Sequence, residues 1–234
     1  MEIISGYDFF EKPEAMHREY SGTLGSMVIQ KVLAGEPATR HVTIWQYRKF
    51  VSTTPYGQIS SKNLPNTRIV NPETLSQTVI DNPEFDLAEG KFLLNQPSNI
   101  GNIAFQYSTT HHILDFLRFA GLLVETGVIG DREILRFFNL RYMIIGGAEL
   151  GTYPTEWWMT AYAKINRVAL LFSERYGPCN TNHSYQRRAL AFLQERLGSY
   201  LVIHHLAALT SDVLSYPHGY LHTVTCSADY NIGT

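Results

Sequence analysis

Four segments in the second half of the chain repeat their apolar residues at the three- and four-residue spacing of an amphipathic helix. They cover residues 103–126, 131–145, 155–176 and 184–215. Each is followed by a glycine or a proline, residue types that end helices. The connections between the segments are only about four to nine residues long, and such short links favour antiparallel neighbours. We therefore expect antiparallel helices over residues 103–216.

The first part of the chain shows strand rather than helix signals. Residues 40–54 are rich in β-branched and aromatic types, which predicts a strand, and residues 66–70 offer it a hairpin partner. Asn71 and Asn82 each precede a Pro-Glu pair, the pattern of a capped helix start. The C-terminal tail again resembles a strand. The fold class predicted is α+β, predominantly α-helical, with a smaller β-containing N-terminal part.

Two domain divisions fit this pattern. In the first, an irregular, β-containing part spans residues 1–70, and a helical domain with a strand-like C-terminal tail spans residues 71–234. In the second, the whole chain is one domain. The chain has 234 residues, of which 44% are hydrophobic and 17% charged, so it is long enough and apolar enough to bury a core in either case.

The net charge and the absence of targeting signals limit which partners and which cellular compartment we expect for the protein. The net charge of -2 gives no electrostatic reason to bind nucleic acid or an anionic membrane. The N-terminus lacks a basic segment followed by an apolar one, so we expect no signal peptide. No window approaches the ~18 apolar residues of a membrane span. The only two cysteines, Cys179 and Cys226, form no disulfide framework. We expect a soluble, cytoplasmic or intracellular protein in a reducing compartment, without a membrane partner.

The histidines near the C-terminus raise the question of a metal site. The candidate ligands are His204, His205, His218, His222 and Cys226. The last three are four residues apart, and on a helix one metal ion would reach them. The β-branched residues between them favour a strand instead, where ligands four residues apart are ~13 Å from each other. We therefore expect no metal and no other cofactor, and keep a metal-dependent enzyme as an alternative.

Three further pairs resemble catalytic or metal-binding pairs. His111 and Asp115 have the spacing at which a carboxylate orients a general base on a helix. Cys179 and His183 could pair as a thiolate and an imidazole. Glu14–His17 has the ExxH spacing of di-iron bundles but lacks the second motif that those sites need. We expect all three to be structural residues.

Arginines provide a second alternative. They gather on two predicted helices as Arg132, Arg136, Arg187, Arg188 and Arg196. With nearby aromatic rings they would suit single-stranded nucleic acid. Glutamates lie close to the same arginines in sequence, so salt-bridged surface faces are favoured over a nucleic-acid site.

The leading functional hypothesis is non-enzymatic. The sequence contains no phosphate-binding glycine loop, nucleophile elbow or metalloprotease motif. It is rich in tyrosine and phenylalanine and poor in lysine, which favours ordered contacts. We expect a scaffold or self-assembling structural subunit, for example capsid- or nucleocapsid-like, that forms a homo-oligomer or a larger assembly. Trp158 aligns with the core face of its helix, whereas Trp157 lies on the flank, where either the N-terminal β-containing part or, the favoured alternative, another subunit would cover it.

Overall fold

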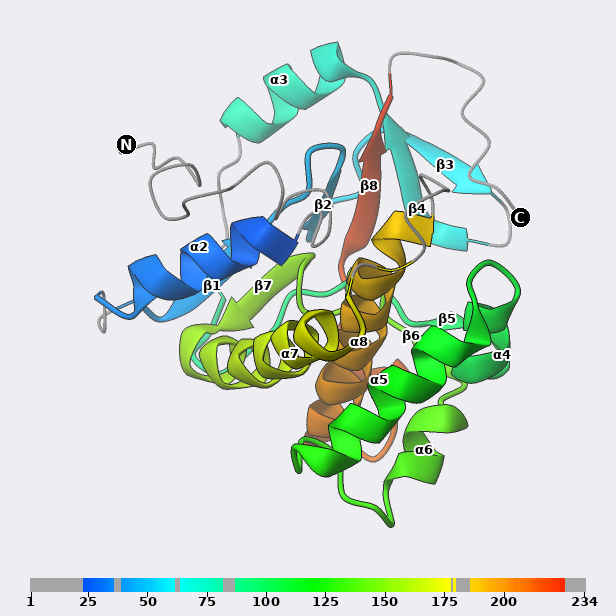
Figure 1. Ribbon diagram of the computed structural model, residues 1–234. Coiled ribbons are helices and arrows are strands. Elements are labelled where there is room, and N and C mark those ends of the chain that lie inside the picture. The colour runs from blue at the N-terminus through cyan, green and yellow to red at the C-terminus, as the bar shows by residue number, and fades with distance from the viewer. Residues whose placement is uncertain are drawn as a thin grey trace.

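The computed structural model describes residues 23–35, 39–61, 64–81, 87–177, 179 and 186–225 (Figure 1). The helices are α2 (Thr23–Leu33), α3 (Pro72–Asp81), α4 (Ile103–Ser108), α5 (Ile113–Glu125), α6 (Ile134–Phe138), α7 (Thr155–Tyr176) and α8 (Ala189–Leu209). The strands are β1 (His41–Ile44), β2 (Lys49–Ser52), β3 (Gln58–Ser61), β4 (Leu64–Val70), β5 (Ser98–Asn99), β6 (Tyr142–Met143), β7 (Gly151–Pro154) and β8 (Tyr220–Val224). Two short 3-10 helices, η2 (Gln186–Arg188) and η3 (Val213–Ser215), flank α8.

The predicted mixture of helices and strands, with helices prevailing, is confirmed. The antiparallel arrangement of residues 103–216 and the division at residue 70 stay predictions. None of the described helices is both long enough and apolar enough to cross a membrane.

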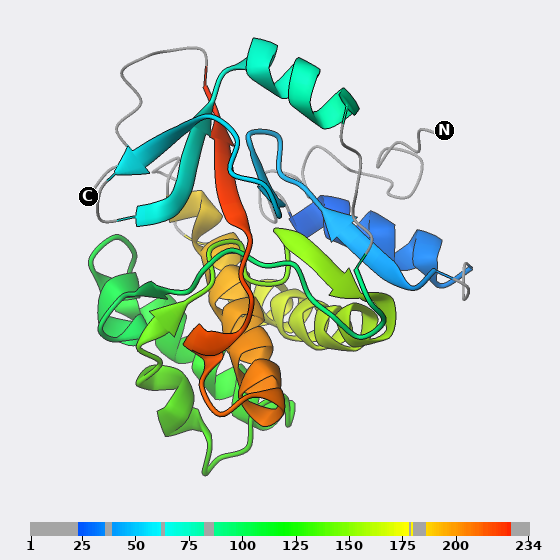
Figure 2. The same cartoon turned by 180° about the vertical axis from the view of Figure 1, so that it is seen from behind.

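The largest sheet joins strands from both ends of the chain in the order β2-β8-β4-β3 (Figures 1 and 2). Strand β8 runs antiparallel to β2 and parallel to β4, so His222 lies between Phe50 and Arg68. The predicted strand near the C-terminus is thus confirmed as β8. The predicted hairpin of residues 40–54 with residues 66–70 is wrong, because β8 lies between them. A sequence pattern cannot show that a strand from far along the chain inserts at this place.

Residues 40–54 form two strands rather than one. The chain reverses between Gln46 and Lys49, whose backbone groups are hydrogen-bonded to each other at 2.9 and 3.1 Å. Strand β1 leaves this turn to pair with β7, while β2 enters the larger sheet. The turn contains neither glycine nor proline, the residue types that mark a turn in a sequence, and for this reason it was not predicted.

The two helix starts that the sequence marked most clearly differ in outcome. The side chain of Asn71 accepts a hydrogen bond from the backbone of Thr74 at 2.6 Å, as predicted for the cap of α3. The matching start at Asn82 lies outside the described residues. In the segment predicted from residue 131, α6 begins only at Ile134, and Asp131 accepts a hydrogen bond from its neighbour Arg132 instead of capping the helix.

The helices share one large core, and the sheet has a smaller one. The larger cluster includes Trp158, which is fully buried as predicted, together with Phe116 and Phe172. The smaller cluster joins Val51 and Leu221 of the sheet to Leu150, which precedes β7. The segment before β7 therefore lies between the sheet and the helices, in contact with both.

Candidate functional site

A tight loop from Ile144 to Leu150 connects β6 to β7 and packs against α8. Gly146 and Gly147 have φ angles of 84° and 57°, a backbone conformation that other residues rarely adopt. A Cβ atom on Gly147 would overlap the carbonyl oxygen of Glu195 in α8. The Gly-Gly pair therefore allows a close approach of two backbones, and it does not simply end a helix as the sequence suggested.

Side chains from two other segments bind the backbone of this loop. Ser199 of α8 accepts a hydrogen bond from the N–H of Ile144 at 2.9 Å. The fully buried amide of Asn95 donates to the carbonyl of Ile145 at 2.8 Å and accepts from its N–H at 3.2 Å. Glu195 accepts from the N–H of Gly146 at 2.7 Å. The loop thus has a fixed conformation although it has no regular secondary structure.

Two buried aromatic side chains also form hydrogen bonds with the backbone of the loop. The hydroxyl of Tyr153 donates to the carbonyl of Gly147 at 2.8 Å and accepts from the N–H of Leu150 at 3.2 Å. The indole of Trp158 donates to the carbonyl of Ala148 at 2.8 Å. These bonds satisfy backbone groups that would otherwise be costly to bury, and they determine where the next side chain, Glu149, is placed.

Glu149 is the chemically unusual residue of the loop. The hydroxyl of Tyr162 in α7 donates to its carboxylate at 2.5 Å. The pKa of Glu149 is raised to about 8: burial raises it most, the hydrogen bond from Tyr162 lowers it, and the charge of Glu195 adds a smaller increase. The residue as a whole remains partly exposed, although its carboxyl group is largely enclosed. A carboxyl group with a pKa near neutral can exchange a proton with a reactant, which makes it a candidate catalytic group.

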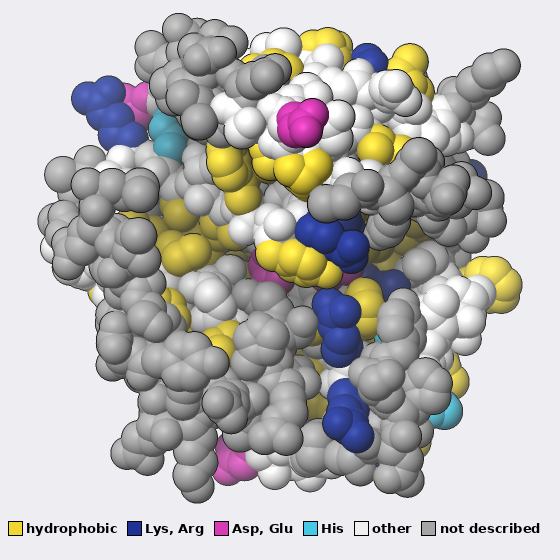
Figure 3. Space-filling model, turned by 90° about the horizontal axis from the view of Figure 1, so that it is seen from above, with side chains coloured by type: hydrophobic (Ala, Val, Ile, Leu, Met, Phe, Trp, Pro, Cys, Tyr) yellow, Lys and Arg dark blue, Asp and Glu magenta, His cyan; other side chains and the backbone are white. Residues whose placement is uncertain are grey.

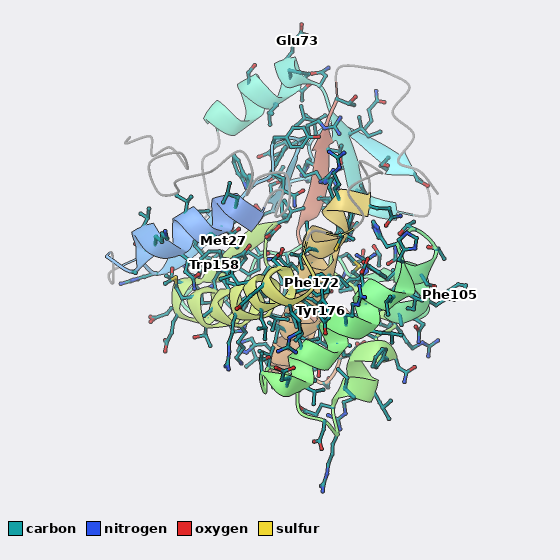
Figure 4. The ribbon with its side chains drawn as sticks, in the orientation of Figure 1. Met27, Glu73, Phe105, Trp158, Phe172 and Tyr176 are labelled. Atoms are coloured by element: carbon teal, nitrogen blue, oxygen red, sulfur yellow. The ribbon has the colours of Figure 1, made fainter. Side chains whose placement is uncertain are left out.

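Helix α2 completes this group of residues, which we call the carboxyl site: Ser26, Glu149, Tyr162 and Glu195. Ser26, which is almost fully buried, is hydrogen-bonded to Tyr162. Figure 4 shows that Met27 of α2 lies beside Trp158 of α7, and both residues belong to the larger core, so the two helices are in contact. Four separate segments therefore meet at one pair of carboxyl groups.

The end of α2 that carries Ser26 points toward the middle of the molecule in Figure 1. Figure 3 shows the molecule from above: Lys and Arg side chains gather near the middle of this face, and acidic side chains are recessed beside them. Acidic and basic groups thus occur together on the upper face.

The predicted metal ligands that the structure describes do not lie together in one site. His204 and His205 are neighbours on α8, and His218 contacts the carbonyl of Val213 at 3.1 Å. His222 is fully buried in the sheet, where its Nε2 accepts from the N–H of Tyr56 and its ring stacks on Phe50 with centroids 4.5 Å apart. Among the described residues, no three His, Cys, Asp or Glu side chains could hold a metal ion. Cys226 lies outside the described residues.

The five arginines predicted as a nucleic-acid site differ in burial and in their hydrogen-bond and ion-pair partners. Arg196 is buried and donates to the carbonyl of Phe192 at 2.8 Å and to the side chain of Gln106. Arg136 is exposed and lies 3.9 Å from Glu133. Arg132 precedes α6, while Arg187 and Arg188 are exposed in η2. Buried Arg196 cannot join the others on one surface, and the nucleic-acid alternative stays a prediction.

The remaining pairs have structural partners where the structure describes them. Nδ1 of His111 contacts the side chain of Gln186 at 3.2 Å, and Asp115 pairs with Arg118 at 3.6 Å, so they do not form a catalytic pair with each other. Cys179 is buried. Its predicted partner His183 and the Glu14–His17 motif lie outside the described residues.

Trp157 is half-buried, and the side chain that covers it comes from the segment before β5 and not from residues 1–70, which were expected to cover it if no other subunit did. Its ring stacks on Tyr153, with centroids 5.7 Å apart, and meets the ring of Phe92 edge-on at 5.1 Å. Phe92 lies outside the helices, so a part of the same chain covers one side of the indole. Contact of Trp157 with another subunit stays a prediction.

Comparisons with known proteins add a fold relationship. No family model matches the chain, and no curated protein matches it. Among solved structures, it is similar to the apo structure of the bifunctional glycosyltransferase WbbM, with a TM-score of 0.64 and 13% sequence identity. The match covers 89% of this chain but only 37% of that chain, so this chain has the fold of one part of a longer enzyme.

This match contradicts the prediction of a non-enzymatic scaffold or self-assembling structural subunit. The prediction rested on the absence of short catalytic motifs. Absence of such motifs does not exclude an enzyme, because a candidate site such as the carboxyl site takes its members from residues 26, 149, 162 and 195, which share no local motif. The sequence marks this candidate site only by the Gly146-Gly147 pair just before Glu149, and such a pair is also typical of a helix end.

Proposed function

We propose that this chain is a glycosyltransferase domain that moves a sugar from an activated donor, such as a nucleotide sugar, to an acceptor hydroxyl. The observation that carries the proposal is the similarity of its fold, over 89% of its length, to part of WbbM. The carboxyl site supplies the acid–base chemistry that such a reaction requires.

The reaction needs a group that accepts one proton. The bond between the anomeric carbon of the donor sugar and its phosphate breaks, and the phosphate leaves with the electron pair. The acceptor oxygen forms the new glycosidic bond and gives up its proton. A general base works best when its pKa is near the operating pH, and Glu149, whose pKa is raised to about 8, meets this condition. We assign the proton-accepting role to Glu149.

Glu195 and Tyr162 act as positioning residues in this proposal. Glu195 binds the N–H of Gly146, and its charge helps to keep the pKa of Glu149 high. Tyr162 fixes the Glu149 carboxyl group by its hydrogen bond. Because α7, α8 and the loop hold these groups, the base is preorganised before substrate binds.

The test measures nucleotide release by the full chain from a panel of nucleotide sugars, with and without saccharide acceptors. Glu149→Gln keeps the shape of the side chain but removes the base, so the rate should fall by about 100-fold or more. Glu156→Gln, at an exposed position in the first turn of α7, is the matched control and should retain the wild-type rate. Absence of release from every donor would refute the proposed function, and full activity of Glu149→Gln would refute the role of Glu149.

A further inference from the structure

A groove of about 290 Å³ lies between the first half of α7 and the second half of α8. Helix α7 lines it with Trp157, Thr160 and Lys164, and helix α8 lines it with Leu201, His204 and His205. Each helix also contributes one alanine, Ala161 and Ala208. Thr160 and Lys164 are each two residues from Tyr162, which places them about 200° around the helix from it. The groove is thus on the side of α7 that faces away from the carboxyl site.

One wall of the groove is a tryptophan ring whose position is fixed. The stacking of Trp157 on Tyr153 and its edge contact with Phe92 hold the indole from two directions. The ring of His205 lies 5.7 Å from it at an angle of 50°. An anchored aromatic ring offers a flat apolar surface at little cost in conformational entropy, as in other recognition sites.

The polar groups around this ring can both donate and accept hydrogen bonds. Lys164 carries an ammonium group, which donates only, while Thr160 carries a hydroxyl. Burial and the neighbouring His204 lower the pKa of His205, so its ring is neutral and presents one donor and one acceptor. A carboxylate oxygen of Glu133 lies 3.9 Å from Nε2 of His204. The groove is therefore polar without being strongly charged.

This combination is complementary to a sugar ring, which has an apolar C–H face and a rim of hydroxyl groups that donate and accept. A peptide helix fits less well, because recognition of a helix in a groove depends on several apolar anchor pockets. Apart from Trp157, Leu201 is the one large apolar side chain here. A strongly anionic ligand also fits less well, because Lys164 is the only permanent charge in the lining.

We infer that the α7–α8 groove binds a saccharide, namely a part of the acceptor chain remote from the sugar that receives the new bond. This inference rests on the proposed function and names its acceptor as an oligosaccharide. The groove would hold the chain by Trp157 and its polar neighbours, while the carboxyl site acts on the growing end. It would therefore favour long acceptors over short ones.

Binding to the full chain can be measured by saturation-transfer NMR with three probes: maltohexaose, cellohexaose and chitohexaose. We expect at least one of them to bind. Two variants impair the groove in different ways. The double variant Lys164→Ala/His204→Ala removes polar contacts, and the single variant Ala208→Trp fills the space. Each should weaken binding by about tenfold or more. Arg167→Ala, an exposed position on α7 outside the groove, should bind as the wild type does.

Two results would overturn the inference: none of the three hexasaccharides binds, or the groove variants bind as tightly as Arg167→Ala. The Glu149→Gln variant separates this inference from the proposed function, because it should lose transfer but retain saccharide binding. If transfer persists without binding in the groove, the groove inference alone fails. If hexasaccharides bind in the groove but no donor sugar is transferred, the proposed function alone fails.

Discussion

The two halves of α8 use polar residues in opposite ways. In the first half, Glu195 and Ser199 direct their side chains at the backbone of the Gly-Gly loop, and Ser199 is fully buried. In the second half, His204 is exposed and His205 half-exposed, and they line an open groove. Polar groups of the first kind maintain the structure of a site. Those of the second kind are available to a ligand, so substitutions in the two halves should have different consequences.

The largest effect is expected at the loop itself. Gly147→Ala introduces a Cβ that overlaps the backbone of Glu195 at a φ of 57°. It should lower the free energy of unfolding by about 3 kcal/mol or more, measured by urea denaturation. Gly177→Ala is the matched control: it also has a positive φ of 68°, but no atom lies within 4 Å of the added methyl group. It should cost only about 1 kcal/mol. Equal losses in both variants would show that the loop is not pressed against α8.

The second effect concerns pH. Because the folded protein raises the pKa of Glu149 from 4.5 to about 8, the folded state holds a proton that the unfolded state releases between these values. The stabilisation from Glu149 is complete below pH 4.5 and is lost as pH rises through about 8. The melting temperature should fall over this range, and Glu149→Gln should remove that part of the dependence. An unchanged pH profile in Glu149→Gln would contradict the raised pKa.

A smaller effect is expected at Ser199. Ser199→Ala leaves the buried N–H of Ile144 without its acceptor, which should cost about 1–2 kcal/mol of unfolding free energy. Denaturant unfolding of the variant measures this loss directly. A change below about 0.5 kcal/mol would mean that another acceptor, such as a water molecule, replaces the serine hydroxyl.

The smallest effect is expected in the groove. His204→Ala and Lys164→Ala remove exposed side chains, so each should change the unfolding free energy by less than about 0.5 kcal/mol. Urea denaturation of these variants gives unfolding free energies that can be compared with those of the loop variants. A loss as large as that of Ser199→Ala would show that the groove residues serve the fold and not a ligand.

The sequence predicted the helical regions better than the sheet, because helix signals are local. Apolar spacing located α5, α7 and α8, and Asn71 identified the start of α3. Pairing of β8 with β2 joins residues more than 160 positions apart, and no pattern within either strand specifies that partner. The carboxyl site escaped prediction for the same reason, since Ser26, Tyr162 and Glu195 meet Glu149 only in the folded chain.

The central position of β8 has a consequence for how the protein forms during synthesis. Strands β2 and β4 leave the ribosome early, whereas the strand that separates them is made among the last residues described. Until then, each presents an unpaired edge, to which another nascent chain could add. Closing so long a loop is also slow. The four-stranded sheet can therefore be completed only after β8 has left the ribosome, and until then β2 and β4 each keep an open edge.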